Sequence, residues 1–139
     1  MIKAIIWDLY GVVYKNGQID PKAKDIVEQL KAKGIINATI SNLSPNTVKE
    51  IGNQLGLDPI IACAESGQSK TDANTYQKFI NDLNIKPEEC LMIDDLISNL
   101  LPAKQVGIKT VLFSKNNETD EVDFALDDIE KIVKLIKSL

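Results

Sequence analysis

The sequence contains no histidine and only two cysteines among its 139 residues. The absence of histidine excludes catalysis by Ser–His and Cys–His pairs, because no imidazole is present to act as the base. Cys63 and Cys90 are too few and too far apart for a zinc site, and the usual companion ligand is missing. A chain of 15.4 kDa buries enough surface to fold without a disulfide or a structural metal. We therefore expect both cysteines to be small buried side chains without a chemical role.

Clusters of positive charge and long apolar runs are also missing from the sequence. The formal net charge is −4, and no cluster of lysines offers a face for nucleic acid or an anionic membrane surface. No stretch approaches the length of a transmembrane helix, and the apolar run after Lys3 meets Asp8 too early for a signal peptide. We expect a soluble cytoplasmic protein with neither a nucleic-acid nor a membrane partner.

Hydrophobic residues make up 44% of the chain and charged residues 26%, which is the balance of a folded protein. At this length we expect a single domain over residues 1–139. Apolar runs typical of buried strands alternate with amphipathic segments typical of helices. Strands are predicted at 2–7, 35–41, 60–63, 90–93, 109–113 and 124–126, and helices from near residues 20, 44, 72, 98 and 127. This alternation predicts an α/β fold with a doubly wound parallel sheet of the Rossmann-like kind.

Three segments are expected to lie outside this regular pattern. The dipeptide Asn16-Gly17 stands between two short β-prone runs, which is the signature of a tight β-hairpin. Residues 64–70 and 114–123 are polar and are predicted to be loops, the second of them on the surface.

Polar side chains follow four of the predicted strands. Asp8 ends the first strand, Ser41 the second and Asp94-Asp95 the fourth, and Lys70 lies in the loop after the third. The carboxyl ends of parallel strands meet at one edge of a sheet, so we expect these residues to lie close together. Three neighbouring carboxylates repel one another, and one lysine cannot neutralise them. Oxygen ligands without histidine or cysteine point to Mg²⁺ as the compensating cation.

The order of these residues resembles that of the haloacid dehalogenase-like (HAD) hydrolase superfamily over essentially the whole chain. The similar segments are residues 5–13, 39–42, 67–72 and 91–95, the last followed by Asn99. Any one of these segments is a weak signal, whereas the four in this order are specific. The resemblance implies a HAD core in which the hairpin at Asn16-Gly17 is the flap beside the site.

The resemblance also implies a role for each residue that binds or attacks the substrate. Asp8 is the nucleophile that forms an aspartyl intermediate, and Ser41 donates a hydrogen bond to a phosphoryl oxygen. Asn42 accompanies Ser41 as a substrate-binding residue. Lys70 offsets the negative charge of Asp8 and of the phosphoryl group, as a transition state rich in negative charge requires.

A second set of residues is implied to hold the metal. These are the side chains of Asp8, Asp94 and Asp95, which bind Mg²⁺ directly or through water, and the backbone carbonyl of Tyr10. The carbonyl ligand does not depend on which side chain is present at position 10.

Tyr10 departs from the pattern of the family's phosphatases, which carry a second aspartate two residues after the nucleophile as general acid and base. A phenol with a pKa of about 10 exchanges protons poorly at neutral pH, which puts about 10²–10⁴ in rate at risk. We expect slow turnover if Tyr10 acts as the proton donor. The alternative is that Tyr10 forms an aromatic wall of the site.

Three functions are left open by these residues. The first is a Mg²⁺-dependent phosphatase acting on a small phosphorylated substrate or a phosphorylated macromolecule. The second is a dehalogenase, because a halide leaving group needs no proton. The third is a degenerate member that binds a phosphorylated ligand without turnover.

The spacing between the similar segments bears on this choice. Residues 12–40 and 42–69 leave room only for single helices, strands and the hairpin, so we expect no cap domain. An open site does not exclude water by itself, which favours phosphoryl chemistry over dehalogenation. It also predicts that a partner subunit or a macromolecular substrate covers the site, with self-association favoured.

Overall fold

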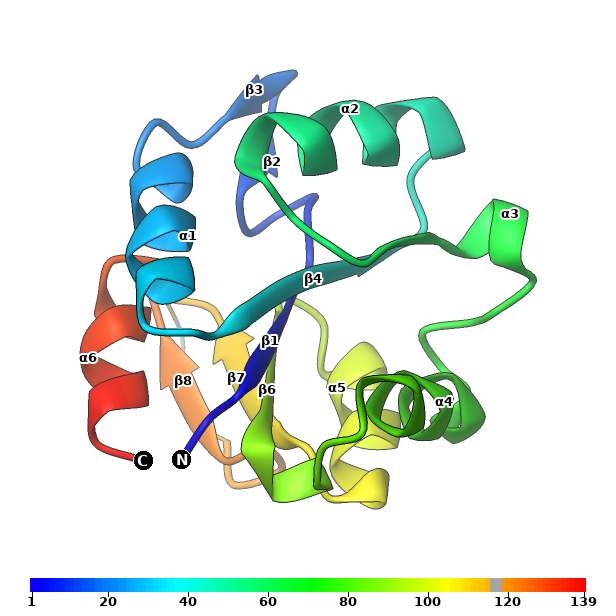
Figure 1. The fold of residues 1–139 in the computed structure, drawn as a ribbon, viewed down its shortest axis with the longest axis vertical. Coiled ribbons are helices and arrows are strands. Elements are labelled where there is room, and N and C mark those ends of the chain that lie inside the picture. The colour runs from blue at the N-terminus through cyan, green and yellow to red at the C-terminus, as the bar shows by residue number, and fades with distance from the viewer. Residues whose placement is uncertain (116–118) are drawn as a thin grey trace.

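The computed structural model describes residues 1–115 and 119–139 and contains a central sheet in which all neighbouring strands are parallel (Figure 1). The strand order is β5-β4-β1-β6-β7-β8. The strands are β1 (Ala4–Trp7), β4 (Ile36–Ser41), β5 (Ile60–Ala62), β6 (Cys90–Asp94), β7 (Lys109–Phe113) and β8 (Phe124–Leu126). The prediction of a parallel sheet is confirmed.

Helices cover both faces of this sheet (Figure 1). Side chains alternate between the two faces of a strand. Ile5 and Trp7 therefore pack with α1, α2 and α6, while Ala4 and Ile6 pack with α4 and α5. The helices are α1 (Ala23–Ala32), α2 (Pro45–Leu55), α3 (Cys63–Ser66), α4 (Ala73–Leu83), α5 (Ile97–Val106) and α6 (Lys131–Lys137), with a 3₁₀ turn at η1 (Pro87–Glu89). Burial of both faces explains why β1 is apolar at every position.

Local sequence signals account for the starts of two helices and for the hairpin. The Ser44 hydroxyl accepts a hydrogen bond from the Thr47 amide at the start of α2, and Asp72 accepts one from the Asn74 amide at the start of α4. Asn16 and Gly17 have φ of 53° and 75°, as a tight hairpin turn requires. This turn joins β2 (Tyr14–Lys15) to β3 (Gln18–Ile19).

Among the described residues, the buried side-chain nitrogen and oxygen atoms all have hydrogen-bond partners. Asn37, a polar residue within β4, accepts a hydrogen bond from the Trp7 indole nitrogen at 2.9 Å and donates one to the Ile35 carbonyl.

Cys90 is buried at the start of β6, as predicted, while Cys63 is only partly buried in α3, and both are free thiols. Burial raises the pKa of the Cys90 thiol to about 12, so this thiol stays protonated at neutral pH.

Two predictions about the loops were partly wrong. The segment predicted as a loop at 64–70 contains most of the short helix α3. In the segment 114–123, residues 116–118 lie outside the described residues, but Val122 is buried. The Asp123 carboxylate accepts a hydrogen bond from the Thr110 amide at 2.8 Å, which ties the end of this segment to β7. The described residues of this segment form no helix or strand and, apart from Val122, are exposed or partly exposed, so the prediction of a surface loop fails only at Val122.

The last helix also begins later than predicted, at Lys131 instead of near residue 127. The Asp128 carboxylate accepts hydrogen bonds from the Glu130 amide and from the Lys22 ammonium group, each at 3.0 Å or less. These bonds hold a turn ahead of the helix. Asp128 therefore stabilises the turn before the helix and its contact with the start of α1.

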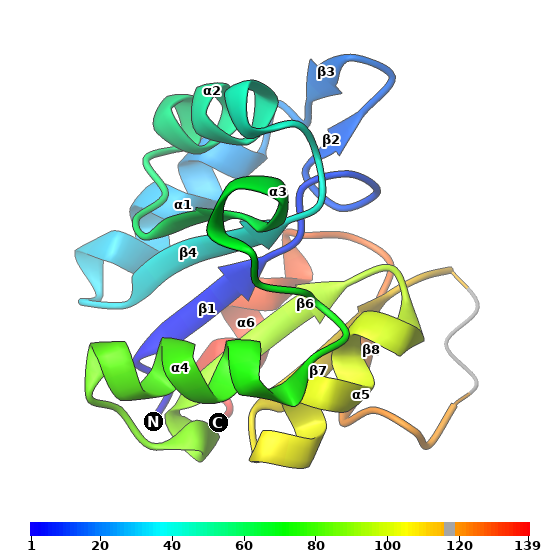
Figure 2. The same cartoon turned by 90° about the vertical axis from the view of Figure 1, so that its right-hand side faces the viewer.

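Strands β1, β4 and β6 all point toward the same edge of the sheet (Figure 2). Between β1 and β4 lie only the hairpin and α1, and between β4 and residue 70 lie only α2, β5 and α3. All residues of these two connections are described, and neither contains a cap domain. Within the described part of the chain, no helix has the length and apolar character needed to cross a bilayer.

Candidate active site

Three carboxylates meet at the centre of the sheet's carboxyl edge. Trp7 in β1 pairs with Ile93 in β6, so the residues that follow them, Asp8 and Asp94, lie side by side. The Asp8 amide donates a hydrogen bond to the Ile93 carbonyl at 3.0 Å, which extends this pairing past the end of β1. Carboxylate oxygens of Asp8, Asp94 and Asp95 all lie within 4.8 Å of one another. The structure thus brings together the three acidic residues singled out in the sequence.

Lys70 enters this cluster from the loop between α3 and α4. Its ammonium nitrogen lies 2.7 Å from Asp8 Oδ1 and 2.7 Å from Asp94 Oδ2. The side chain is 2% exposed, so both ion pairs are shielded from water. The Tyr76 hydroxyl on α4 donates a hydrogen bond to the Lys70 carbonyl at 2.6 Å. This bond fixes the loop that delivers the ammonium group, a role of Tyr76 that sequence reasoning missed.

Asp94 is held on several sides. Besides Lys70, its carboxylate accepts a hydrogen bond from the Leu96 amide at 2.9 Å. The Asn99 side-chain amide on α5 donates to the same carboxylate, with a nitrogen to Oδ2 distance of 3.2 Å. A fully buried carboxylate requires such partners, because an unpaired charge in the interior is costly. Asp94 is therefore the most firmly positioned of the three carboxylates.

The cluster carries more negative than positive charge. Burial, joined by the neighbouring Asp94, raises the pKa of Asp8 from 3.8 to about 7 against the opposing effect of Lys70. Burial also raises the pKa of Asp95. Burial lowers the pKa of Lys70, but Asp8 and Asp94 more than offset this, and the pKa lies above its usual value. Burial thus disfavours the ionised forms of Asp8 and Asp95 even with a charged lysine nearby. An additional cation would favour their ionisation.

Gly11 was not singled out in the sequence analysis, yet it shapes the site. Its backbone has φ of 89°, in the left-handed region that favours glycine. A Cβ atom at this position would lie 2.2 Å from Asp95 Oδ2. The absence of a side chain at Gly11 therefore lets the β1–β2 loop approach the Asp95 carboxylate. A glycine three residues after Asp8 was the signal available in the sequence.

The remaining candidate residues lie at the same edge but outside the charge cluster. Ser41 is buried at the end of β4, where its hydroxyl oxygen accepts a hydrogen bond from the Leu43 amide at 3.2 Å. Asn42 follows it and is exposed. Among the described residues, no hydrogen bond joins Ser41 or Asn42 to Asp8 or Lys70.

Tyr10 lies at the rim, with 58% of the residue exposed. Among the described residues, none forms a hydrogen bond with its hydroxyl, and the Tyr10 carbonyl likewise accepts no hydrogen bond from them. The adjacent amide of Gly11 donates to the Tyr14 carbonyl at 2.9 Å, which ties this loop to the hairpin. The Tyr10 side chain is thus positioned by its backbone and not by contacts with the carboxylates.

Comparison with known proteins identifies relatives of this chain. The sequence model of the haloacid dehalogenase-like hydrolase family matches residues 13–107. The ribulose-1,5-bisphosphate 5-phosphatase of Halopiger xanaduensis is 30% identical over 124 residues, which cover 85% of this chain and 52% of that protein. The chain therefore spans about half the length of this curated relative.

Solved structures share the fold. The 3-deoxy-D-manno-octulosonate 8-phosphate phosphatase of Moraxella catarrhalis, solved with magnesium and phosphate ions and KDO, matches with a TM-score of 0.76 and 20% identity. This match covers 99% of the present chain and 86% of that one. The L-2-haloacid dehalogenase of Xanthobacter autotrophicus, with chloropropionic acid covalently bound, has a TM-score of 0.80, 12% identity and full coverage of both chains. The same fold thus accompanies phosphatase and dehalogenase chemistry.

Proposed function

Since the chain belongs to the haloacid dehalogenase-like hydrolase family, we propose that it hydrolyses phosphate monoesters with Asp8 as the nucleophile and Mg²⁺ as the cofactor. The observation that carries this proposal is the buried Lys70 ammonium group, 2.7 Å from both Asp8 and Asp94, with the Asp95 carboxylate beside them. This arrangement sets a nucleophile next to fixed positive charge, which transfer of a phosphoryl group requires. The relatives named as phosphatases support the same reaction class.

The chain's own residues supply the covalent chemistry. In the first step a carboxylate oxygen of Asp8 attacks phosphorus, and the bond from phosphorus to the ester oxygen breaks. The departing oxygen takes up a proton from water and leaves as an alcohol. In the second step water attacks phosphorus of the aspartyl phosphate, which releases inorganic phosphate and restores the Asp8 carboxylate. Lys70 offsets the negative charge in both steps, and the Ser41 hydroxyl donates to a phosphoryl oxygen with Asn42 beside it.

The residues present fit a magnesium ion. Three carboxylates within 4.8 Å offer only oxygen ligands, and the Tyr10 carbonyl receives no hydrogen bond from the described residues. We assign the ion to Asp8, Asp94, Asp95 and the Tyr10 carbonyl. When bound, Mg²⁺ supplies positive charge beside the phosphoryl oxygens.

Hydrolysis measurements with Asp8→Asn test the reaction. The wild-type protein with Mg²⁺ is expected to release phosphate from an aryl phosphate, and Asp8→Asn to lower that rate by at least about 10³-fold, because the amide is not a nucleophile. Asp25→Asn, on the exposed face of α1, is the matched control and should keep the wild-type rate. Phosphate release by Asp8→Asn at the wild-type rate would contradict the assignment.

Calorimetry tests the cation site independently of turnover. Mg²⁺ is expected to bind the wild-type protein and to bind the double variant Asp8→Asn, Asp95→Asn much more weakly, because two of the three carboxylates have lost their charge. Equal Mg²⁺ affinity of the two proteins would remove these residues from the metal site.

Hydrolysis of a carbon–halogen bond is the second candidate function, and Tyr10 is the residue that favours it. A halide leaving group needs no proton, so the missing aspartate at position 10 carries no penalty in that reaction. Chloride release from a 2-haloacid without phosphate release from esters would favour this candidate. Binding of a phosphate analogue with neither activity would instead indicate a non-catalytic member of the family.

A further inference from the structure

A cleft of about 400 Å³ opens beside the carboxylates on the side of β7 and β8. Its wall includes Gly11 and Asp95, so the cleft is continuous with the active site. The rest of the wall comes from the hairpin, the end of β7 and the turn after β8. These lining residues are Lys15, Phe113, Ser114, Lys115 and Asp127. The volume lies in the range of about 300–1,000 Å³ that is usual for sites of small ligands.

Lys15 is held at this cleft by an aromatic ring. Its ammonium nitrogen lies 5.3 Å from the centroid of the Phe113 ring, a cation–π contact that joins the hairpin to β7. This contact uses the face of the ring and leaves the ammonium group able to donate hydrogen bonds to a ligand. Among the described residues, no carboxylate forms an ion pair with Lys15. The positive charge of Lys15 is therefore positioned but not neutralised.

A second lysine, Lys115, also brings positive charge, unpaired among the described residues, to the part of the cleft that is farther from Asp95. Lys115 follows β7, and it too forms no ion pair with the described part of the chain. Asp127 lines the cleft, but its carboxylate pairs with the ammonium group of Lys131, four residues later at the start of α6. Asp95 is turned toward Asp8 and the backbone of Gly11. Two ammonium groups thus remain for a ligand at the outer part of the cleft.

We propose that Lys15 and Lys115 bind a second anionic group of the substrate, so that the enzyme acts on phosphate monoesters with a phosphate or a carboxylate at their other end. This inference rests on the proposed function, because it places the reacting phosphoryl group at Asp8. Charge-assisted hydrogen bonds to the second anion orient the ester in a site that has no cap to enclose it. We call this pair of lysines, with Phe113 beneath Lys15, the anion subsite.

A series of synthetic esters tests the anion subsite. Each monophosphate of the diols from ethanediol to pentanediol is compared with the corresponding bisphosphate and with the phosphoryl ester of the equivalent hydroxy acid. The wild-type protein is expected to prefer the doubly anionic esters by about tenfold or more in kcat/KM, mainly through KM, as one charge-assisted hydrogen bond supplies. Preference for the bisphosphate identifies phosphate as the second group, and preference for the carboxylate identifies carboxylate.

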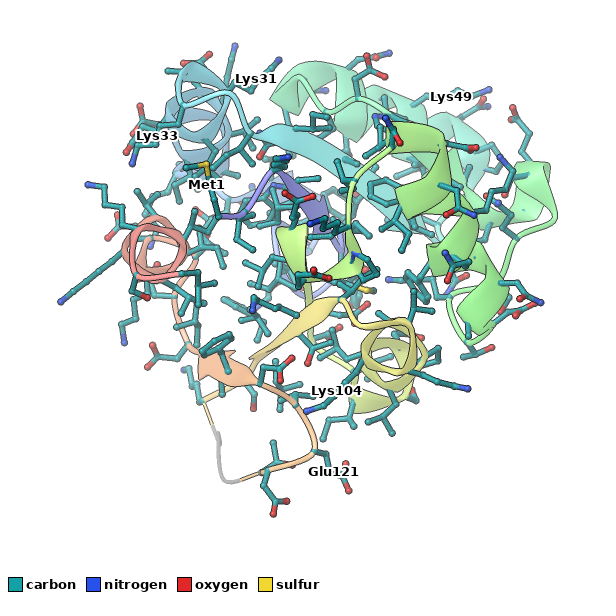
Figure 3. The ribbon with its side chains drawn as sticks, turned by 60° about the horizontal axis from the view of Figure 1, so that its bottom comes forward. Met1, Lys31, Lys33, Lys49, Lys104 and Glu121 are labelled. Atoms are coloured by element: carbon teal, nitrogen blue, oxygen red, sulfur yellow. The ribbon has the colours of Figure 1, made fainter. Side chains whose placement is uncertain are left out.

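Variants of the subsite give the decisive comparison. Lys15→Gln and Lys115→Gln should each lower the ratio of kcat/KM between doubly anionic and neutral-ended esters severalfold, and Lys15→Arg should retain most of it. Lys33 is the matched control, because it is an exposed lysine at the far end of α1 (Figure 3). Lys33→Gln is expected to keep the wild-type ratio.

Failure of the subsite and failure of the proposed function give different results. If the wild-type protein hydrolyses neutral-ended and doubly anionic esters equally well, the anion subsite is wrong and the phosphatase stands. A wild-type preference that survives in both glutamine variants overturns the subsite as well. If no ester is hydrolysed, calorimetry with propane-1,3-bisphosphonate and propylphosphonate decides. Tighter binding of the bisphosphonate that is lost in Lys15→Gln supports the subsite, and equal binding of the two probes overturns it.

Discussion

The buried charge cluster and the exposed rim of the site, formed by Tyr10 and Lys15, are held in place by different kinds of contact. Asp8 and Asp94 lie at the carboxyl ends of the adjacent strands β1 and β6, and ion pairs of 2.7 Å join both to Lys70 from the loop between α3 and α4. At the rim, Tyr10 and Lys15 lie on the loop and hairpin after β1, and both are exposed. The cluster is determined by the sheet and by contacts between distant parts of the chain. The rim is held by fewer contacts, such as the bond from the Gly11 amide to the Tyr14 carbonyl and the contact of Lys15 with the Phe113 ring.

This difference bears on how the two regions tolerate substitution. Buried, mutually dependent charges cannot change one at a time without leaving a partner unpaired. Exposed rim residues have few partners, and substitutions there cost little stability. In the proposed reaction, the leaving group and the far end of the substrate meet the rim. Substitutions in the cluster should therefore have large effects on folding, and substitutions at the rim should mainly change rates and preferences.

Lys70→Met should break the cluster with the largest effect on stability. The substitution leaves Asp8 and Asp94 adjacent in the interior without their ammonium partner, which costs about 3–5 kcal/mol for a buried pair. Urea unfolding in metal-free buffer measures the loss, and added Mg²⁺ should recover part of it. Lys78→Met breaks an exposed ion pair with Asp82 and should change the free energy of unfolding little. Equal stability of Lys70→Met and the wild-type protein would contradict the role of the cluster.

The Gly11→Ala substitution tests the contact between the loop after β1 and the Asp95 carboxylate. The left-handed backbone and the added Cβ, 2.2 Å from Asp95 Oδ2, should together cost about 1–3 kcal/mol. Gly34→Ala separates the two causes, because Gly34 has φ of 81° and a Cβ there would meet no atom within 4 Å. Gly11→Ala should therefore lose more stability than Gly34→Ala in urea unfolding and should also weaken Mg²⁺ binding in calorimetry. Equal losses and unchanged Mg²⁺ affinity would show that the approach to Asp95 is unimportant.

Much of the fold and the buried cluster could be predicted from the sequence, because both follow from short-range patterns. The strands β7 and β8 have the predicted bounds, 109–113 and 124–126. Asp8, Asp94 and Asp95 were identified because each follows a buried strand, and parallel strands end at one edge. Periodicity and strand order were therefore enough to bring these residues together.

The parts that could not be predicted depend on contacts between distant residues. The Tyr76 ring is buried, and its hydroxyl bond to the Lys70 carbonyl depends on how α4 packs. The close approach of Gly11 to Asp95 depends on the path of two loops that are remote in sequence. Charge pattern alone placed the start of the last helix too early, because Asp128 binds Lys22 across the fold.

The Tyr10→Asp substitution tests whether the residue at position 10 limits turnover. Tyr10 is largely exposed and forms no hydrogen bond with the described residues, so the substitution should leave the protein folded. Attack of Asp8 on an aryl phosphate needs little protonation of the leaving group, and this first step should proceed in the wild-type protein. Hydrolysis of the aspartyl phosphate needs a base to activate water, and a protonated phenol is not one at neutral pH. The wild-type protein should therefore show a burst of the aryl alcohol followed by slow turnover.

Stopped-flow kinetics with an aryl phosphate measures both phases. Tyr10→Asp should abolish the burst and raise the steady-state rate about tenfold, because an exposed carboxylate recovers only part of the benefit of a positioned general base. Tyr10→Phe is the control: it should match the wild-type rate if the ring is only a wall of the site, and a slower rate would assign a proton-transfer role to the hydroxyl. If the wild-type protein shows no burst and Tyr10→Asp is slower, Tyr10 is suited to a reaction whose leaving group needs no proton. The rim would then select halide release or binding without turnover, while the cluster beneath it stayed the same.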